Sequence, residues 1–170
     1  MRYIISILFL FSIGACSIDR HEDKPKIIIN ASIVRSYDTV LIYQDTTLFK
    51  AYDVKLSIKN KSDKSISFWM MTCSWEDNFF INNDYIHFLG HACDSNSPWI
   101  TQLESNESKV LESSIIKVQH TRYQRVETTK FGLIFIDSVN CKSPFYFDQI
   151  VGDKSKYNTI IWSNALYLNE

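Results

Sequence analysis

The chain has 170 residues, 45% of them hydrophobic and 14% aromatic, with 18 basic and 19 acidic side chains and a formal net charge of −1. That is enough apolar material for one domain with a real core, and it excludes a mostly disordered chain. A near-neutral sequence without a basic block also excludes the electrostatic signature of nucleic-acid binding.

The N-terminal segment has the pattern of an export signal. Arg2 provides a positive charge, and residues 4–13 form an apolar run. The run suits a signal-peptide core but is too short to span a bilayer, which needs about 20 residues. It ends in the motif Ile13-Gly14-Ala15-Cys16.

This motif resembles the lipobox of bacterial lipoproteins. The resemblance implies that residues 1–15 are removed as a lipoprotein signal peptide and that Cys16 is acylated as the mature N-terminus. It places the protein in the bacterial cell envelope, attached to the membrane through its lipid, and Ser17 after the cysteine implies the outer membrane. Residues 16–25 then form a polar tether, and residues 26–170 form the domain. An ordinary secretory signal with a nearby cysteine is the alternative.

Three cysteines are left once Cys16 is assigned to the anchor: Cys73, Cys93 and Cys141. Exported proteins fold in an oxidising environment, so we expect one disulfide and one spare thiol. We favour Cys73 with Cys93, which flank a loop-rich segment. Closing that loop stabilises the fold by about 3 kcal/mol in the loop-entropy model. The spacing alone does not fix the pairing, so the other two pairings stay open.

After the tether, the hydrophobic pattern is typical of short strands. Residues 52–59 alternate, with Val54, Leu56 and Ile58 on one face, which predicts a half-buried strand. The polar residues 60–64 predict a turn, after which residues 66–72 return as the partner strand. The apolar residues 132–136 do not alternate and predict a central strand covered on both sides. Further strands are expected at residues 26–34, 78–88, 99–103, 109–118, 131–137, 145–151 and 158–168.

The spacing of these strands predicts a fold class. No segment combines a sustained helical period with a capping residue, so we expect an all-β fold, a single antiparallel β-sandwich. The order of Leu56-Ser-Ile-Lys-Asn-Lys-Ser62, Leu103-Glu-Ser-Asn-Glu-Ser108 and a buried strand near the C-terminus resembles the immunoglobulin-like domains of exported bacterial proteins. This resemblance implies an architecture and not a function.

The common catalytic motifs are absent from the sequence. There is no Gly-x-Ser-x-Gly elbow and no His-Glu-x-x-His pair, and the glycines are too far apart for a phosphate-binding loop. Glu76 and Asp77 are adjacent, whereas a glycosidase needs two carboxylates held apart across a cleft, so they favour a solvated acidic turn. We therefore expect a protein that is not an enzyme and has no cofactor.

A metal site is the main alternative. His87, His91 and Cys93 place three potential ligands within seven residues, and Met70 or Met71 could add a thioether. Such a set would suit copper or zinc. The competing interpretation is that Cys93 is oxidised and that the methionines fill gaps in the core.

Aromatic residues are concentrated between residues 68 and 99. Strand alternation would turn Trp69 away from the face that buries Phe68, and Trp75 and Trp99 fall in or beside loops. We predict that Trp69, Trp75 and Trp99 form a contact surface beside the Cys73–Cys93 loop. Burial of these rings on both faces is the alternative.

The sequence therefore predicts a lipid-anchored, non-enzymatic binding module whose partners are the membrane and an unidentified protein or glycan. A metal-handling envelope lipoprotein, using His87, His91 and Cys93 for copper or zinc, is the second hypothesis.

Overall fold

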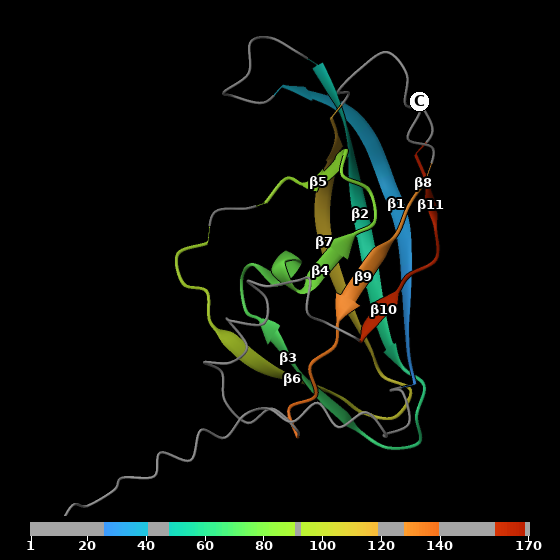
Figure 1. Cartoon of the computed structure of the whole chain (residues 1–170), viewed down its shortest axis with the longest axis vertical. Helices are drawn as coiled ribbons and strands as arrows, with labels where there is room; N and C mark the ends of the chain where they lie inside the picture. The colour runs from blue at the N-terminus through green and yellow to red at the C-terminus, as the bar shows by residue number, and fades with distance from the viewer. Residues whose placement is uncertain (1–25, 41–47, 91–92, 119–127, 140–158, 169–170) are drawn as a thin grey trace, which may run out of the picture.

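The computed structural model describes residues 26–40, 48–90, 93–118, 128–139 and 159–168. These residues form antiparallel strands joined by turns and one short 3₁₀ helix (Figure 1). No helix among them is both long and apolar enough to cross a membrane. Several predicted features lie outside the described residues, namely the signal peptide, Cys16, the tether, His91, Cys141 and the strand at residues 145–151.

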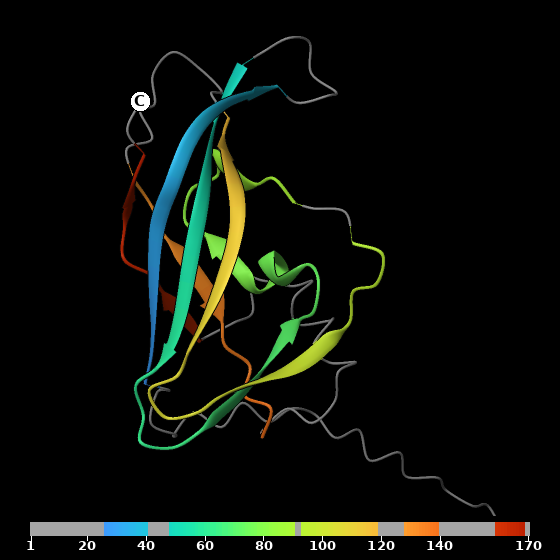
Figure 2. The same ribbon diagram turned by 180° about the vertical axis from the view of Figure 1, so that it is seen from behind.

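The first layer is a four-stranded sheet in the order β1-β2-β7-β5. Its strands are β1 (Ile27–Val40), β2 (Leu48–Asn60), β7 (Ser108–Lys117) and β5 (Ile86–Phe88). The three long strands run side by side in both views (Figures 1 and 2). The predicted alternation of β2 is confirmed, because Val54, Leu56 and Ile58 are at most 1% exposed. Both long N-terminal strands extend beyond the predicted ranges.

The second layer is a three-stranded sheet in the order β10-β9-β4. Its strands are β10 (Ile160–Trp162), β9 (Phe131–Ile134) and β4 (Phe79–Ile81). It lies in front of the long strands in Figure 1 and behind them in Figure 2. All four residues of β9 are buried, which confirms the predicted central strand.

Two smaller pairs complete the described strands. One joins β3 (Ile66–Met71) to β6 (Pro98–Leu103), and the other joins β8 (Thr128–Thr129) to β11 (Leu166–Tyr167). The 3₁₀ helix η1 (Trp75–Asn78) follows β3 directly. At the lower left of Figure 1, the β3–β6 pair extends to one side of the two layers.

The hydrophobic core lies between the layers. Its members come from both sheets and from the β3–β6 pair, and include Ile29, Leu56, Phe68, Phe79, Ile115, Phe131 and Leu133. Burial of each large apolar side chain contributes about 1.5–3 kcal/mol. The predicted all-β, antiparallel sandwich is therefore confirmed.

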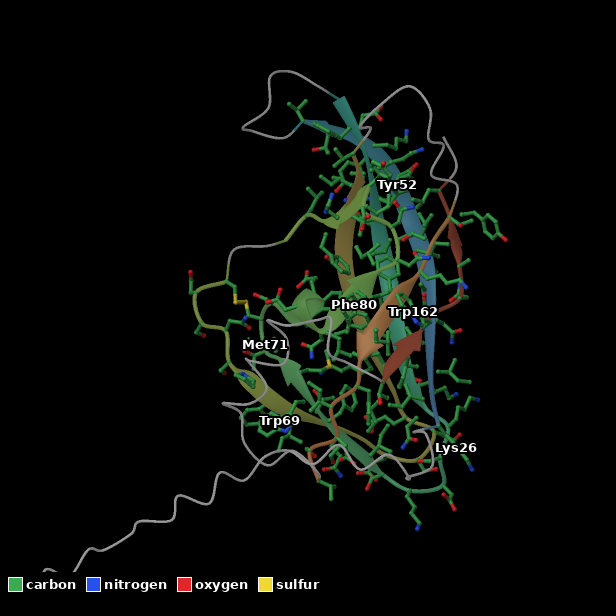
Figure 3. All side chains as sticks on the ribbon, in the orientation of Figure 1. Lys26, Tyr52, Trp69, Met71, Phe80 and Trp162 are labelled. Carbon is green, nitrogen blue, oxygen red and sulfur yellow. A yellow bond between two sulfur atoms is a disulfide. The ribbon has the colours of Figure 1, made fainter. Side chains whose placement is uncertain are left out.

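A glycine lies between two aromatic residues on the outer face of the second layer. Phe80, Gly132 and Trp162 occupy one row across β4, β9 and β10, and Figure 3 shows the two labelled rings on either side of β9. A Cβ on Gly132 would lie 2.5 Å from Cγ2 of Ile160 and 2.9 Å from the Trp162 ring. Glycine is needed here because its neighbours approach the backbone closely.

The predicted pairing of residues 66–72 with 52–59 is wrong. Strand β3 pairs with β6, and both edges of β2 are already taken by β1 and β7. The turn after β2 therefore carries the chain out of the first sheet instead of closing a hairpin.

Asn60 organises this crossing. Its side chain is fully buried, and its Nδ2 donates to the carbonyl oxygens of Lys64, Leu103 and Glu104 at 2.7, 3.1 and 3.1 Å. Its Oδ1 accepts from the backbone N and Oγ of Ser62 at 2.8 and 2.6 Å. One amide thus joins the end of β2 to the end of β6, where the chain returns to the first sheet.

Two predicted strands are interrupted. Residues 78–88 divide into β4 and β5 around a turn, in which the backbone N of Tyr85 donates to Oδ1 of Asn83 at 3.0 Å. Residues 158–168 divide into β10 and β11 around Asn164. The Asn164 side chain accepts a hydrogen bond from the Ala31 backbone N at 2.7 Å and donates one to the Ala31 carbonyl at 3.0 Å. It therefore satisfies both backbone groups of this residue at the edge of β1. Asparagine side chains compete with strand pairing in this way.

Candidate functional site

A disulfide closes a loop on one side of the sandwich. Cys73 and Cys93 are bonded, with their Cα atoms 5.9 Å apart and a sequence separation of 20, so the favoured pairing is confirmed. The loop contains η1, β4 and β5. In Figure 3 the bond is visible to one side of the two sheets.

Hydrogen bonds hold the neck of this loop together as well. Oδ1 of Asn96 accepts from the backbone N atoms of Cys73 and Ser74 at 3.3 and 3.1 Å. The backbone N of Thr72 donates to the carbonyl of Ser97 at 3.0 Å, and the Ser97 N donates to Oγ1 of Thr72 at 3.1 Å. The two arms of the loop are therefore joined by the disulfide and by four hydrogen bonds.

The loop contains an open cleft of about 430 Å³. This volume is within the range of small-molecule sites. The lining residues that the structure describes come from η1, β4, the following turn, β5 and the residues flanking them. They are Ser74, Glu76, Asp77, Phe79, Phe80, Ile81, Asn83, Asp84, Ile86, His87, Phe88 and Gly90. All of these lie between the two bonded cysteines.

Two asparagines fix the walls of the cleft to the sandwich. Asn78, which is fully buried, accepts from the Met71 backbone N at 2.9 Å and donates to the Trp69 carbonyl at 3.3 Å, so η1 is attached to β3. Oδ1 of Asn82 accepts from the Lys130 backbone N at 2.7 Å and continues the contact of β4 with the β9 segment. On the opposite wall, β5 is paired with β7.

Aromatic rings form a packed group beneath the cleft. Trp75 contacts Phe79 and Phe88 edge to face, with ring centroids 5.6 and 5.9 Å apart. Phe88 in turn contacts Phe131 of β9 at 5.6 Å. Such pairs add about 0.5–1.5 kcal/mol beyond the burial of their area. The cleft therefore lies on a firm aromatic base joined to the core.

The predicted tryptophan surface is wrong in two of its three members. Trp69 and Trp75 are only 6% and 8% exposed, whereas Trp99 is 67% exposed. Trp75 turns inward because η1 places its ring against Phe79 and Phe88. Trp69 is buried because β3 is covered on both faces, with Phe68 and Met70 buried beside it. The alternative of burial on both faces holds for these two rings.

Among the residues of the metal hypothesis, those that the structure describes are not brought together as ligands, and His91 lies outside the described residues. His87 is exposed on β5 and lines the cleft, while Cys93 is oxidised and offers no thiolate. Met70 is 2% exposed in the core and Met71 is half-buried. In the part of the chain that the structure describes, no three His, Cys, Asp or Glu side chains are grouped as a metal site would require.

The two residues of the predicted acidic turn differ in their exposure to solvent. Asp77 is exposed, but Glu76 is only 8% exposed, and its Oε1 accepts from the Ser113 hydroxyl of β7 at 2.9 Å. No special role was predicted for Asp84 or Phe80, which line the same cleft as Glu76 and Asp77. The available signal was the density of acidic and aromatic residues within one disulfide loop.

A separate polar network lies on the outer face of the first sheet. The Ser114 hydroxyl and the Arg35 Nε donate to Asp53, and together they hold the pKa of that carboxyl below its usual range. The same contact raises the pKa of Arg35. The Arg35 guanidinium also lies over the Tyr37 ring, 5.2 Å from its centroid. This network is made by β1, β2 and β7 and contributes no residue to the cleft lining.

No protein-family model matches the chain, and no curated protein matches it at a significant level. Among solved structures, the crystal structure of a FixG-related protein from Vibrio parahaemolyticus is similar over 85% of this chain and 98% of that chain, with 10% sequence identity and a TM-score of 0.38. No functional conclusion is drawn from a similarity this distant.

Proposed function

We propose that this protein is a non-enzymatic binding module of the bacterial cell envelope, anchored in the outer membrane by a lipid on Cys16, and that its ligand site is the cleft of the Cys73–Cys93 loop. The ligand is a protein or a glycan. The observation that carries the proposal is that one disulfide encloses all of the cleft-lining residues that the structure describes.

Two features support the location. The motif Ile13-Gly14-Ala15-Cys16 follows an apolar run of signal-peptide length, and disulfides persist mainly in exported proteins. Residues 17–25 reach about 30 Å when fully extended, so the domain is free to meet a partner away from the membrane surface. With attachment provided by the lipid, the surface of the domain is left for another role.

The build of the cleft supports binding. The disulfide already restricts the loop, so a ligand that binds in the cleft causes little further loss of conformational entropy. The cleft combines exposed polar groups at Asp77, Asp84 and His87 with phenyl rings on a fixed aromatic base. Aromatic anchors surrounded by a polar rim are typical of interaction sites.

The anchor is tested with Cys16→Ser in cells fed labelled palmitate. We expect the variant to incorporate no label and to leave the membrane fraction. A variant that stays labelled and membrane-bound would contradict the lipoprotein assignment.

The site is tested by photo-crosslinking in the native host. A benzophenone amino acid replaces His87 in the cleft, and in a matched control it replaces Tyr167, which is 67% exposed on β11. We expect a covalent adduct from position 87 alone, lost when Cys73 and Cys93 are both changed to serine. Equal adducts from the two positions, or none from position 87, would overturn the proposed site.

A further inference from the structure

We infer that the cleft receives a basic side chain, lysine or arginine, that projects from a partner protein. This inference rests on the proposed function and adds the chemical class of the ligand. The charge of the cleft, its concave shape and its aromatic lining each support this inference.

The charged side chains among the described lining residues all have one sign. They are Glu76, Asp77 and Asp84, and the twelve lining residues that the structure describes include no lysine or arginine. The whole chain, in contrast, is almost balanced, with 18 basic and 19 acidic side chains. The negative charge is therefore a local property of the cleft, and carboxylates gathered in a concave site attract cations and repel anions.

One of these carboxylates is held in place. Glu76 is 8% exposed and accepts the Ser113 hydroxyl at 2.9 Å, which fixes it to β7 at the back of the cleft. A carboxylate fixed in the wall of the cleft attracts a bound ammonium or guanidinium and repels a bound anion.

The lining also has an apolar part, which selects among cations. Phe79, Phe80 and Phe88 line the cleft beside the carboxylates, and Trp75 and Phe131 hold two of these rings in position. Lysine and arginine bury an aliphatic stem while their charged end meets carboxylates or the face of a ring. A bare metal ion has no apolar part that could pack against the rings. A long basic side chain matches both halves of the lining.

This chemistry favours a protein partner over an envelope polysaccharide. Phosphorylated or uronate-containing polymers carry negative charge and would be repelled by three carboxylates. A neutral glycan could stack on the rings but would gain nothing from the charge, so it is an outcome that the experiment must distinguish.

The experiment uses the full-length protein in neutral detergent micelles and three pentapeptides, Ac-Gly-Gly-X-Gly-Gly-amide, with X as lysine, arginine or norleucine. Norleucine keeps the aliphatic stem without the charge. Binding is followed through the imidazole Hε1 proton of His87, which lines the cleft; the chain has only four histidines, and His87→Gln assigns the signal.

We expect the lysine and arginine peptides to shift the His87 signal and the norleucine peptide to bind at least about fivefold more weakly. Asp77→Asn and Asp84→Asn should each raise Kd about two- to fivefold. The matched control Asp63→Asn, in the exposed turn after β2, should leave Kd unchanged. Raising NaCl from about 0.05 to about 0.5 M should weaken the binding of the charged peptides.

Equal binding of the norleucine peptide, or unchanged Kd values in both asparagine variants, would overturn the basic-side-chain inference. If a ligand of any kind, a glycan included, were still cross-linked at position 87 in cells, the proposed binding site would stand without the basic-side-chain inference. If no peptide moved the His87 signal and no adduct formed at position 87, both the ligand class and the site would be wrong.

Discussion

The buried amide of Asn60 provides the sharpest test of how the first sheet is joined to the β3–β6 pair. Asn60→Ala removes three hydrogen bonds donated by Nδ2 and two accepted by Oδ1. Each such bond contributes about 1 kcal/mol net, and a buried group left without a partner costs about 1–3 kcal/mol. Several of the partners are only partly buried and regain water. We therefore expect a loss of about 3 kcal/mol in the free energy of unfolding.

Asn60→Asp is the more demanding variant, because it keeps the shape and changes the chemistry. An oxygen that cannot donate would then face the carbonyl oxygens of Lys64, Leu103 and Glu104. A buried charge without a partner is costly, so this variant should lose more stability than Asn60→Ala at pH 7. Part of the loss should be recovered under acid conditions, where the protonated carboxyl again donates one hydrogen bond.

The assay is urea unfolding of the full-length protein in detergent micelles, followed by tryptophan fluorescence. Asn30→Asp, on the exposed face of β1, is the matched control and should change stability by no more than about 0.5 kcal/mol. An Asn60→Asp variant with the midpoint of the natural protein would refute the role given to this amide.

Three further predictions concern other parts of the fold. Gly132→Ala should lower the free energy of unfolding by about 1–3 kcal/mol, because the new Cβ would overlap Ile160 and Trp162. Ile160→Ala should cost less stability in the Gly132→Ala background than in the natural protein. Fully additive losses in urea unfolding would contradict the overlap. Changing Cys73 and Cys93 together to serine should lower stability by about 3 kcal/mol without reductant, and equal unfolding midpoints would argue against the disulfide. The pKa of Asp53 is lower in the folded protein than its ordinary value, so Asp53 stabilises the fold above that ordinary value, and this contribution is lost as the pH falls through the folded pKa. The natural protein should therefore exceed Asp53→Asn in stability at pH 7 and converge with it in acid, and a gap that is the same at both pH values would count against the Ser114–Asp53–Arg35 network.

Local patterns in the sequence indicated most of the strands but not which strands pair, and they missed the breaks within residues 78–88 and 158–168. The alternation around Leu56 and the unbroken apolar run around Leu133 report directly on burial, and both strands were predicted correctly. Pairing depends on which edges are already occupied. Nothing near residue 66 indicates that β1 and β7 have taken both edges of β2, so the hairpin prediction failed for a reason outside its own segment.

The candidate site was predicted in outline only. The Cys73–Cys93 loop and its aromatic content were evident from the sequence, but the exposure of each ring was not. Trp75 was expected to be exposed because it lies near a loop, yet a single turn of 3₁₀ helix directs it into the base of the cleft. Glu76 was expected in solvent, and its burial depends on Ser113, 37 residues further along the chain.

The cleft and its basic ligand are tested most directly by sequencing the partner peptide that is cross-linked to the benzophenone at position 87 in cells. We expect a protein whose joined peptide carries lysine or arginine beside the cross-linked residue, with no corresponding adduct from position 167. A joined glycan, a joined peptide without basic residues, or the same adduct from both positions would contradict it.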